Sequence, residues 1–168
     1  MKTFIEQAQG YVAYHQNQVT RYTHMIGIPV IIFSLMILLG FIHVVIVGVL
    51  DVNLANIATL VLLVFYFLLN WRLASVLTPI LIFFLWIATF FNQAGPTSFG
   101  LWSFVLLFLV GIVLLFTGHL LEEKRPSSVD NLWHVFIAPL FIVTELFFML
   151  GRMGTLKEEI YGKETAKK

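Results

Sequence analysis

The residues best suited to chemistry stand where a long apolar stretch gives way to a charged one. His119 is followed by Glu122 and Glu123, three and four residues further along the chain. If a helix continues that far, both carboxylates lie on the same face as the histidine. Histidine and carboxylate side chains are ligands that zinc, iron and manganese accept. The spacing therefore predicts either a metal or proton site or a polar cluster at the end of an apolar helix.

Three more histidines are candidates for the same site. His15 and His24 are nine residues apart, which on one unbroken helix is about 900° and places them on opposite faces. They can share a site only if the helix breaks between them, and the polar, partly β-branched residues 17–20 favour a break. His134 opens a later apolar stretch. There it could be a ligand or a hydrogen-bonded residue at the membrane interface.

Other ionisable residues allow two interpretations each. Glu145 is flanked by apolar residues, and an ionisable group at membrane depth is a functional candidate, with Arg72, Arg152 or a histidine as its partner. It could equally hydrogen-bond as a neutral acid inside the bundle. Arg125 could bind a carboxylate through two parallel hydrogen bonds or anchor a cytoplasmic loop. His43 is predicted to lie about two-thirds along the first membrane span, as a structural or lumen-facing residue.

The composition places these residues in a membrane protein. The chain has 168 residues, of which 60% are hydrophobic and 11% charged, against about 45–50% and about 25% in soluble domains. The net charge of +1 gives no reason to expect nucleic-acid binding. With no cysteine in the chain, disulfides, cysteine–zinc sites, thiolate catalysis and iron–sulfur clusters are excluded. The N-terminal residues contain no apolar core of a cleaved signal peptide.

Apolar stretches set the predicted architecture. A bilayer core requires about 20 residues of helix, and four stretches approach or reach that length: 29–50, 55–69, 76–91 and 101–121. A fifth, 132–150, is interrupted by Pro139. We predict an all-α integral membrane helical bundle of about four full spans, with an N-terminal interfacial helix and a C-terminal re-entrant or fifth helix. It forms a single membrane domain over 1–168, with an interfacial segment (1–27), the bundle (28–150) and a hydrophilic basic tail (151–168).

The distribution of Lys and Arg constrains the topology. Loops 51–54 and 92–100 contain neither residue, whereas the N-terminal segment, the second and fourth connections and the tail all do. Because Lys and Arg concentrate in cytoplasmic segments, four spans place all the basic segments on the cytoplasmic side. A fifth complete span would send the basic tail across, so we expect 132–150 to form a re-entrant or interfacial helix pair broken near Pro139, with five spans as the alternative. On this topology four histidines lie near the cytoplasmic interface: His15, His24, His119 and His134.

Three groups of motifs resemble one protein family. They are Tyr14-His15-x8-His24-x2-Gly27-Ile28-Pro29 near the N-terminus, Gly118-His119-x3-Glu123-Lys124-Arg125-Pro126 in the centre, and Asp130-Asn131-Leu132, Ala138-Pro139-Leu140-Phe141 and Glu145-x5-Gly151 towards the C-terminus. Together they are similar to the small multi-pass membrane 2-hydroxy-fatty-acid dioxygenases, known from fungal phytosphingosine breakdown and widespread in bacteria. Thr20 stands where the resemblance leads us to expect asparagine.

The resemblance implies Fe(II)-dependent α-oxidation, in which a 2-hydroxy fatty acid reacts with O2 and becomes one carbon shorter. It implies three histidine ligands, and depth and spacing add His134 as a fourth candidate. The bundle would take the acyl tail, so that the polar head meets iron at the cytoplasmic interface. The matching iron-ligand candidates are His15, His24, His119 and His134, and the residues expected to assist catalysis are Glu122, Glu123 and Arg125.

Two other classes of function stay open. Paired histidines could serve as axial ligands of a haem in a non-catalytic membrane protein. The histidines and glutamates could instead form a proton path or packing network in a small transporter or scaffold, although the chain has no internal repeat of the kind many transporters use. The expected location is a bacterial inner membrane or, in a eukaryote, the endoplasmic reticulum membrane.

Overall fold

A computed structural model describes residues 4–14, 17–46, 50–92, 95–121 and 128–162. Within these ranges the chain is almost entirely helical, with one short β-hairpin. The elements in chain order are α1 (Phe4–Tyr14), α2 (Gln18–Gly40), β1 (His43–Ile46), β2 (Leu50–Asn53), α3 (Leu54–Leu69), α4 (Trp71–Asn92), α5 (Ser98–Leu120), α6 (Ser128–Met149) and α7 (Gly154–Tyr161).

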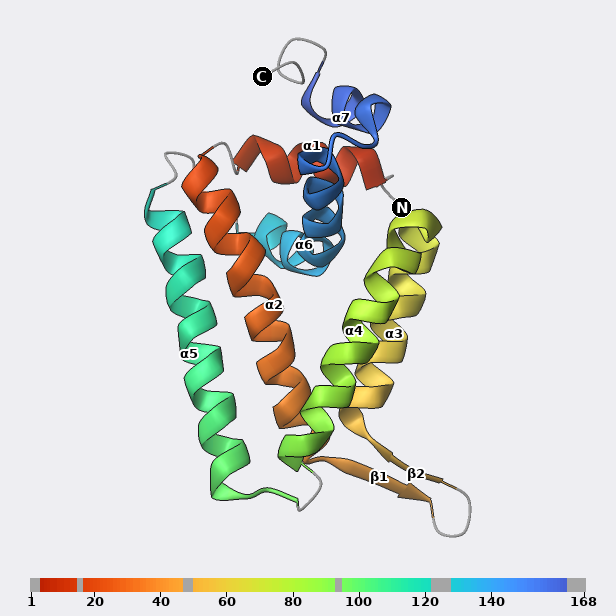
Figure 1. Cartoon of the computed structure of the whole chain (residues 1–168), viewed down its shortest axis with the longest axis vertical. Coiled ribbons are helices and arrows are strands. Elements are labelled where there is room, and N and C mark those ends of the chain that lie inside the picture. The colour runs from red at the N-terminus through yellow and green to blue at the C-terminus, as the bar shows by residue number, and fades with distance from the viewer. Residues whose placement is uncertain (1–3, 15–16, 47–49, 93–94, 122–127, 163–168) are drawn as a thin grey trace.

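Helices α2, α3, α4 and α5 run along the long axis of the molecule (Figure 1). Helix α2 packs against α5, and α3 packs against α4. Helices α1 and α7 lie at one end, and the hairpin lies at the other. Helix α6 sits between α2 and the α3–α4 pair, in the half of the bundle nearer to α1 and α7. This arrangement confirms the predicted all-α membrane bundle with an additional C-terminal helix.

Among the described residues, three helices are long and apolar enough to cross a membrane, namely α2 from Val19, α4 and α5, and the bent pair α6–α7 makes a fourth if it forms one span. Helix α3 is also apolar but has only 16 residues, which corresponds to about 24 Å of helix against a hydrocarbon core of about 30 Å. Large apolar side chains such as Trp102, Leu106 and Phe116 are exposed on α5. An apolar surface of this kind suits contact with lipid.

The predicted first span is wrong in its boundaries. We expected a helix over 29–50, but α2 starts at Gln18, ends at Gly40 and is followed by the hairpin, in which His43 pairs with Asn53. Pro29 therefore lies inside the helix and not in its first turn. The β-branched residues that follow Ile42 raised the hydropathy of the stretch, but such side chains favour a strand over a helix.

The predicted position of His43 is wrong for the same reason. It does not lie within a span but on the exposed hairpin, where its Nδ1 is 2.9 Å from a carboxylate oxygen of Asp51. Asp51, expected in a turn, belongs to strand β2. His43 is thus separated from His24 and His119 by the length of α2.

The predicted helix break before His24 is confirmed. Helix α1 ends at Tyr14, and α2 begins after Asn17. The Asn17 side chain accepts a hydrogen bond from the amide of Val19 at 2.9 Å, which is the normal role of asparagine at a helix N-terminus. Because of this break, α1 lies across the end of the bundle and α2 enters it.

The C-terminal helices turn back and do not continue along the bundle axis. Helices α6 and α7 are bent by 120° relative to each other, and the turn between them includes Gly151 and Met153, both with positive φ. As a result α7 lies at the same end as α1 (Figure 1). The predicted break near Pro139 is wrong, because α6 continues through Pro139 to Met149. The turn after α6 instead suits either a broken span or a re-entrant loop.

Candidate functional site

Two of the predicted metal-ligand residues meet at the end of the bundle that carries α1 and α7. His24 lies near the start of α2, and His119 lies in the last turn of α5. Their ring centroids are 4.9 Å apart, and the rings are nearly perpendicular, at 86°. His24 is buried and His119 is exposed. The antiparallel packing of α2 and α5 thus joins residues that are far apart in the sequence.

The protonation of His24 follows from its hydrogen bond. Its Nδ1 lies 2.8 Å from the backbone carbonyl oxygen of Thr20, one turn earlier in α2. A carbonyl only accepts, so Nδ1 carries the proton and the lone pair of the neutral ring is on Nε2. Histidines that bind metals commonly donate their second nitrogen to a backbone carbonyl in this way. His24 therefore has the tautomer and the support of a metal ligand.

Close packing of α2 on α5 holds the two histidines together. The buried Thr20 hydroxyl donates to the carbonyl of Gly118 at 3.0 Å. A Cβ atom at Gly118 would lie 2.5 Å from the Thr23 hydroxyl oxygen and 2.9 Å from Cε1 of His24. Only glycine allows this approach. Sequence reasoning assigned no role to Thr20 or Thr23, although the small residue directly before His119 was a signal of close helix packing.

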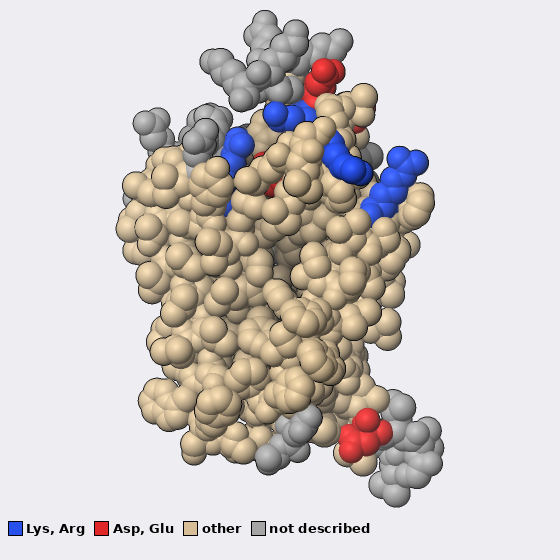
Figure 2. Space-filling view, in the orientation of Figure 1, with Lys and Arg blue, Asp and Glu red and all other residues tan. Residues whose placement is uncertain are grey.

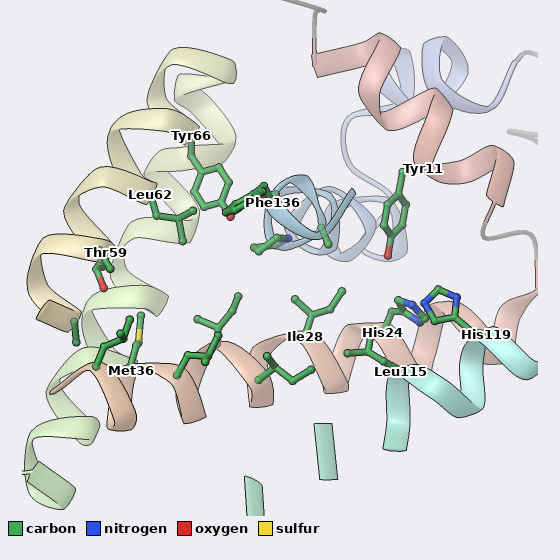
Figure 3. A pocket seen from close by; sticks show the side chains of 18 residues that line it. Tyr11, His24, Ile28, Met36, Thr59, Leu62, Tyr66, Leu115, His119 and Phe136 are labelled. Carbon is green, nitrogen blue, oxygen red and sulfur yellow. The ribbon is translucent and has the colours of Figure 1, made fainter. Parts of the chain in front are cut away.

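The histidine pair stands at one end of an apolar cavity of about 390 Å3. The cavity extends between α2, α3 and α6 (Figure 3), with His24 and His119 at one end and Met36 and Thr59 at the other. Ligand sites in proteins usually have volumes of about 300–1,000 Å3, mostly apolar walls and a few polar groups. The cavity has these properties, with its imidazoles concentrated at one end.

Tyr11 adds a hydroxyl to the polar end of the cavity. It is buried, and its ring packs at a tilt of 43° against Phe141, with the ring centroids 4.5 Å apart. Its hydroxyl points toward the two histidines (Figure 3). Burial raises the pKa of Tyr11 above its usual value, mainly because the phenolate would be desolvated. The phenol therefore stays protonated and can donate a hydrogen bond. Sequence reasoning placed Tyr11 only within the N-terminal interfacial segment.

The remaining predicted site residues cannot be placed from the structure. His15, Glu122, Glu123 and Arg125 lie outside the described residues, and His134 belongs to α6 but its side chain is not described. Within the described ranges no group of three or more His, Asp or Glu side chains is arranged to hold a metal ion. The described site thus consists of two histidines, a tyrosine and the apolar cavity.

Glu145 has different partners from those predicted. Its carboxylate accepts a hydrogen bond from the Tyr161 hydroxyl of α7 and lies 3.9 Å from the guanidinium of Arg21. The Arg21 guanidinium also lies 4.9 Å from the centre of the Tyr161 ring. The expectation of Arg72, Arg152 or a histidine as its partner is not met by these contacts. The cluster instead joins α2, α6 and α7 next to the histidine end.

The chemistry of the donors fits a metal such as iron. An imidazole with its Nδ1 proton bound to a carbonyl, next to a second imidazole from another helix, gives two nitrogen donors of a type that iron accepts. The two rings are in direct edge contact. In this arrangement a haem plane does not fit between them, so the geometry favours a non-haem metal over the paired axial ligation considered above.

Comparisons with known proteins agree with the motifs. Residues 1–150 match the protein family described as 2-hydroxy-palmitic acid dioxygenase Mpo1-like. A segment of 53 residues is 43% identical to the 2-hydroxy-palmitic acid dioxygenase MPO1 of Saccharomyces cerevisiae, covering 30% of this chain and 30% of that protein. No solved structure matches. Because the family match extends over most of the chain, the resemblance is confirmed, and the protein belongs to the Mpo1-like family of 2-hydroxy-palmitic acid dioxygenases.

Proposed function

We propose that this protein is an Fe(II)-dependent dioxygenase that shortens 2-hydroxy fatty acids by one carbon. The observation that carries the proposal is the position of the His24–His119 pair at one end of an apolar cavity. An acyl chain suits the apolar walls, and the polar head would then lie against the imidazoles. The family match and the partial similarity to the yeast enzyme support this substrate class.

The proposed reaction balances without another reductant. A 2-hydroxy acid and one O2 give the fatty acid that is one carbon shorter, carbon dioxide and water. The hydroxyl-bearing carbon becomes the new carboxyl carbon, the old carboxyl carbon leaves as carbon dioxide, and O2 takes up the four electrons. Iron, when bound, supplies O2 activation and open coordination positions for the substrate's oxygens.

The protein's own residues have distinct tasks in this proposal. His24 and His119 bind the metal, with His15 and His134 as the further ligands that the sequence predicts. The carbonyl of Thr20 fixes the orientation of the His24 ring through the Nδ1 hydrogen bond. Glu122 or Glu123 would support a histidine ligand from outside, and Arg125 would bind the substrate carboxylate.

Tyr11 is proposed to orient the substrate head. Its protonated hydroxyl points into the polar end of the cavity, where it can donate to a carboxylate or to the 2-hydroxyl. Because the surrounding walls are apolar, a hydrogen bond to a charged group there is stronger than one in water. The mostly apolar walls at the same time offer water few hydrogen-bonding partners near the reacting carbon.

Metal content and activity test the proposal together. We expect near-stoichiometric iron in anaerobically prepared wild-type protein, and conversion of 2-hydroxypalmitate to pentadecanoate under air. His24→Ala and His119→Ala should each lose iron and activity while still inserting in the membrane. His43→Ala is the matched control, because this exposed histidine lies on the hairpin at the opposite end.

Three results would contradict the proposal. The first is the absence of metal in wild-type protein prepared without oxygen. The second is iron binding without conversion of any 2-hydroxy acid, and the third is full activity in His24→Ala or His119→Ala. Each result removes a different part of the argument: the first removes the metal site, the second the reaction, and the third the assigned ligand.

A further inference from the structure

We propose that the cavity selects substrates by the length of their acyl chain. Leu39 and Ala55, at the far end of the cavity, set the longest chain that fits. This inference rests on the proposed function for the identity of the substrate. Its physical basis is independent of the metal, because it concerns the shape of the apolar part of the cavity. The residues on which this inference depends lie at the hairpin end of the bundle, away from His24 and His119.

The first step is the length of the cavity. Along α2 its lining begins at His24 and ends at Leu39, one residue before the helix terminates. At 1.5 Å per residue this corresponds to about 22 Å. Half of a bilayer core, the depth that one lipid tail normally fills, is about 15 Å. The cavity is therefore long enough for a long-chain fatty acid with its head at the histidines.

Exposure differs among the residues that line the cavity. Leu35 of α2 and Phe136 of α6 are exposed on its side. At the far end the lining residues Met36, Ala55 and Thr59 are buried, with exposures of 5%, 1% and 5%. A chain can thus enter from the side, but its methyl end meets buried protein atoms. A closed end of this kind discriminates by length, since additional methylenes have no space.

The third step is the size of the side chains at the closed end. Ala55 stands in the first turn of α3 and faces the end of α2, where Leu39 also lines the cavity. Among residues other than glycine, alanine has the smallest side chain, so a larger residue at position 55 would shorten the cavity. A smaller residue in place of Leu39 would lengthen the cavity. Substitutions at these two positions, on different helices, are therefore expected to shift the preferred chain length in opposite directions.

The expected shifts follow from the contribution of each methylene. A buried methylene changes affinity by about fourfold. Ala55→Leu fills the space of roughly two to three methylenes, so the affinity for 2-hydroxypalmitate should fall by at least about tenfold while that for 2-hydroxydodecanoate stays unchanged. Leu39→Ala should shift the preference from 2-hydroxypalmitate toward 2-hydroxystearate.

Two controls separate length selection from general damage. Leu38→Ala removes the same number of atoms from the adjacent position of α2, and Leu38 does not line the cavity. Thr59→Val changes the polarity of the far end but leaves its volume nearly the same. Both variants should retain the wild-type ranking of chain lengths. If Ala55→Leu fails to fold, Leu39→Ala against Leu38→Ala still tests the proposal.

The measurement has two parts, so that its failure is distinguishable from failure of the proposed function. In nanodiscs, displacement of a fluorescent fatty acid by 2-hydroxy acids of increasing length gives affinities without any reaction or bound iron. Incubation with an equal mixture of the same acids gives the distribution of products. If no acid is converted but the affinities shift as predicted, the reaction is wrong and the length selection stands.

Other outcomes overturn the length selection itself. Unchanged rankings in both Leu39→Ala and Ala55→Leu would show that the chain does not reach the hairpin end. An equal shift in Leu38→Ala would mean that altered packing, and not cavity length, changes the ranking. Displacement by phospholipid as effective as by 2-hydroxy acids would show that the cavity holds ordinary membrane lipid.

Discussion

At the scale of single residues, Thr20 has two roles through two different atoms. Its backbone carbonyl accepts from Nδ1 of His24, and its buried hydroxyl donates to Gly118 of α5. The first contact orients one imidazole, and the second joins the two helices that carry the histidine pair. The resemblance led us to expect asparagine here, whose amide can also donate a hydrogen bond. A hydrogen-bond donor at this position is thus what the packing requires.

Thr20→Val should separate these two roles. The substitution retains the backbone carbonyl and so the His24 contact, but it removes the hydroxyl donor and leaves a buried carbonyl with one partner fewer. We expect a loss of about 1 kcal/mol of stability, and a decrease in iron affinity smaller than that of His24→Ala. Thermal unfolding in detergent and iron titration measure the two effects. Thr20→Ser, which retains the hydroxyl, is the control, and an equal loss in both variants would contradict the role of the hydrogen bond.

At the scale of elements, α2 and α5 approach closely because each helix has glycines on the face that contacts the other. A Cβ atom at Gly111 would lie 2.5 Å from the Ile31 side chain and 3.1 Å from the backbone oxygen of Gly27. Gly118 makes the same kind of approach next to His24. In membranes, where hydrophobic burial does not distinguish lipid from protein, small residues allow the packing that holds helices together.

Gly118→Ala should therefore disturb the site more than its size suggests. The added methyl collides with the side chains of Thr23 and His24, and overpacking of this kind costs about 1–3 kcal/mol. The helices must move apart, which separates the histidines and should weaken iron binding by about tenfold or more. Iron titration checks this against Gly154→Ala in α7, where a Cβ meets nothing within 4 Å. Wild-type affinity in Gly118→Ala would show that the pair tolerates separation.

The C-terminal helix is attached to the bundle by a small polar cluster. Tyr161 of α7 donates to Glu145 of α6, and Arg21 of α2 lies near both. On the other side, the Gln9 side chain of α1 donates to the backbone oxygen of Glu159 at 2.7 Å. Because Glu145 is buried, removal of the Tyr161 hydroxyl leaves its carboxylate with one hydrogen-bond donor fewer.

Tyr161→Phe should loosen α7 without unfolding the bundle. A hydrogen bond to a charged group contributes about 1.5–3 kcal/mol, and its loss should expose Lys157 to trypsin. We expect cleavage after Lys157 to become at least several-fold faster, as measured by mass spectrometry of timed digests. Tyr22→Phe makes the same change at an exposed tyrosine and should leave the cleavage rate unchanged. Equal rates in all three proteins would mean that other contacts hold α7.

Physical reasons explain what the sequence could and could not predict about these elements. The helical bundle, the break before His24 and the grouping of His24 with His119 at one end followed from apolar length, polar punctuation and charge, but α7 in the predicted hydrophilic tail did not. The hairpin was missed because hydropathy does not distinguish Val44 and Val45 in a strand from the same residues in a helix. The partners of Glu145 were missed because they depend on the turn that brings Tyr161 back to α6. No local sequence pattern predicts the angle of that turn.

At the scale of the whole molecule, charge is distributed along the bundle axis. Arg21 and Arg72 lie near the starts of α2 and α4. Arg152 lies just before α7, and Lys157 lies within it. All these positions are at the end that carries α1, and Figure 2 shows the Lys and Arg side chains gathered there. The connections at the hairpin end, 41–53 and 92–100, contain no Lys or Arg in the sequence. The pattern favours an orientation with the histidine end in the cytoplasm.

Cysteine labelling tests this orientation directly, since the chain has no cysteine of its own. Ser98→Cys places a thiol at the start of α5, on the hairpin end, and Thr155→Cys places one on exposed α7. In bacterial spheroplasts a membrane-impermeant maleimide should label the first variant at once and the second only after permeabilisation. The reverse pattern would put the histidine end outside. Simultaneous labelling of both in intact spheroplasts would mean that the chain crosses an even number of times between the two positions, so that α6 spans the membrane in addition to α5 and is not re-entrant.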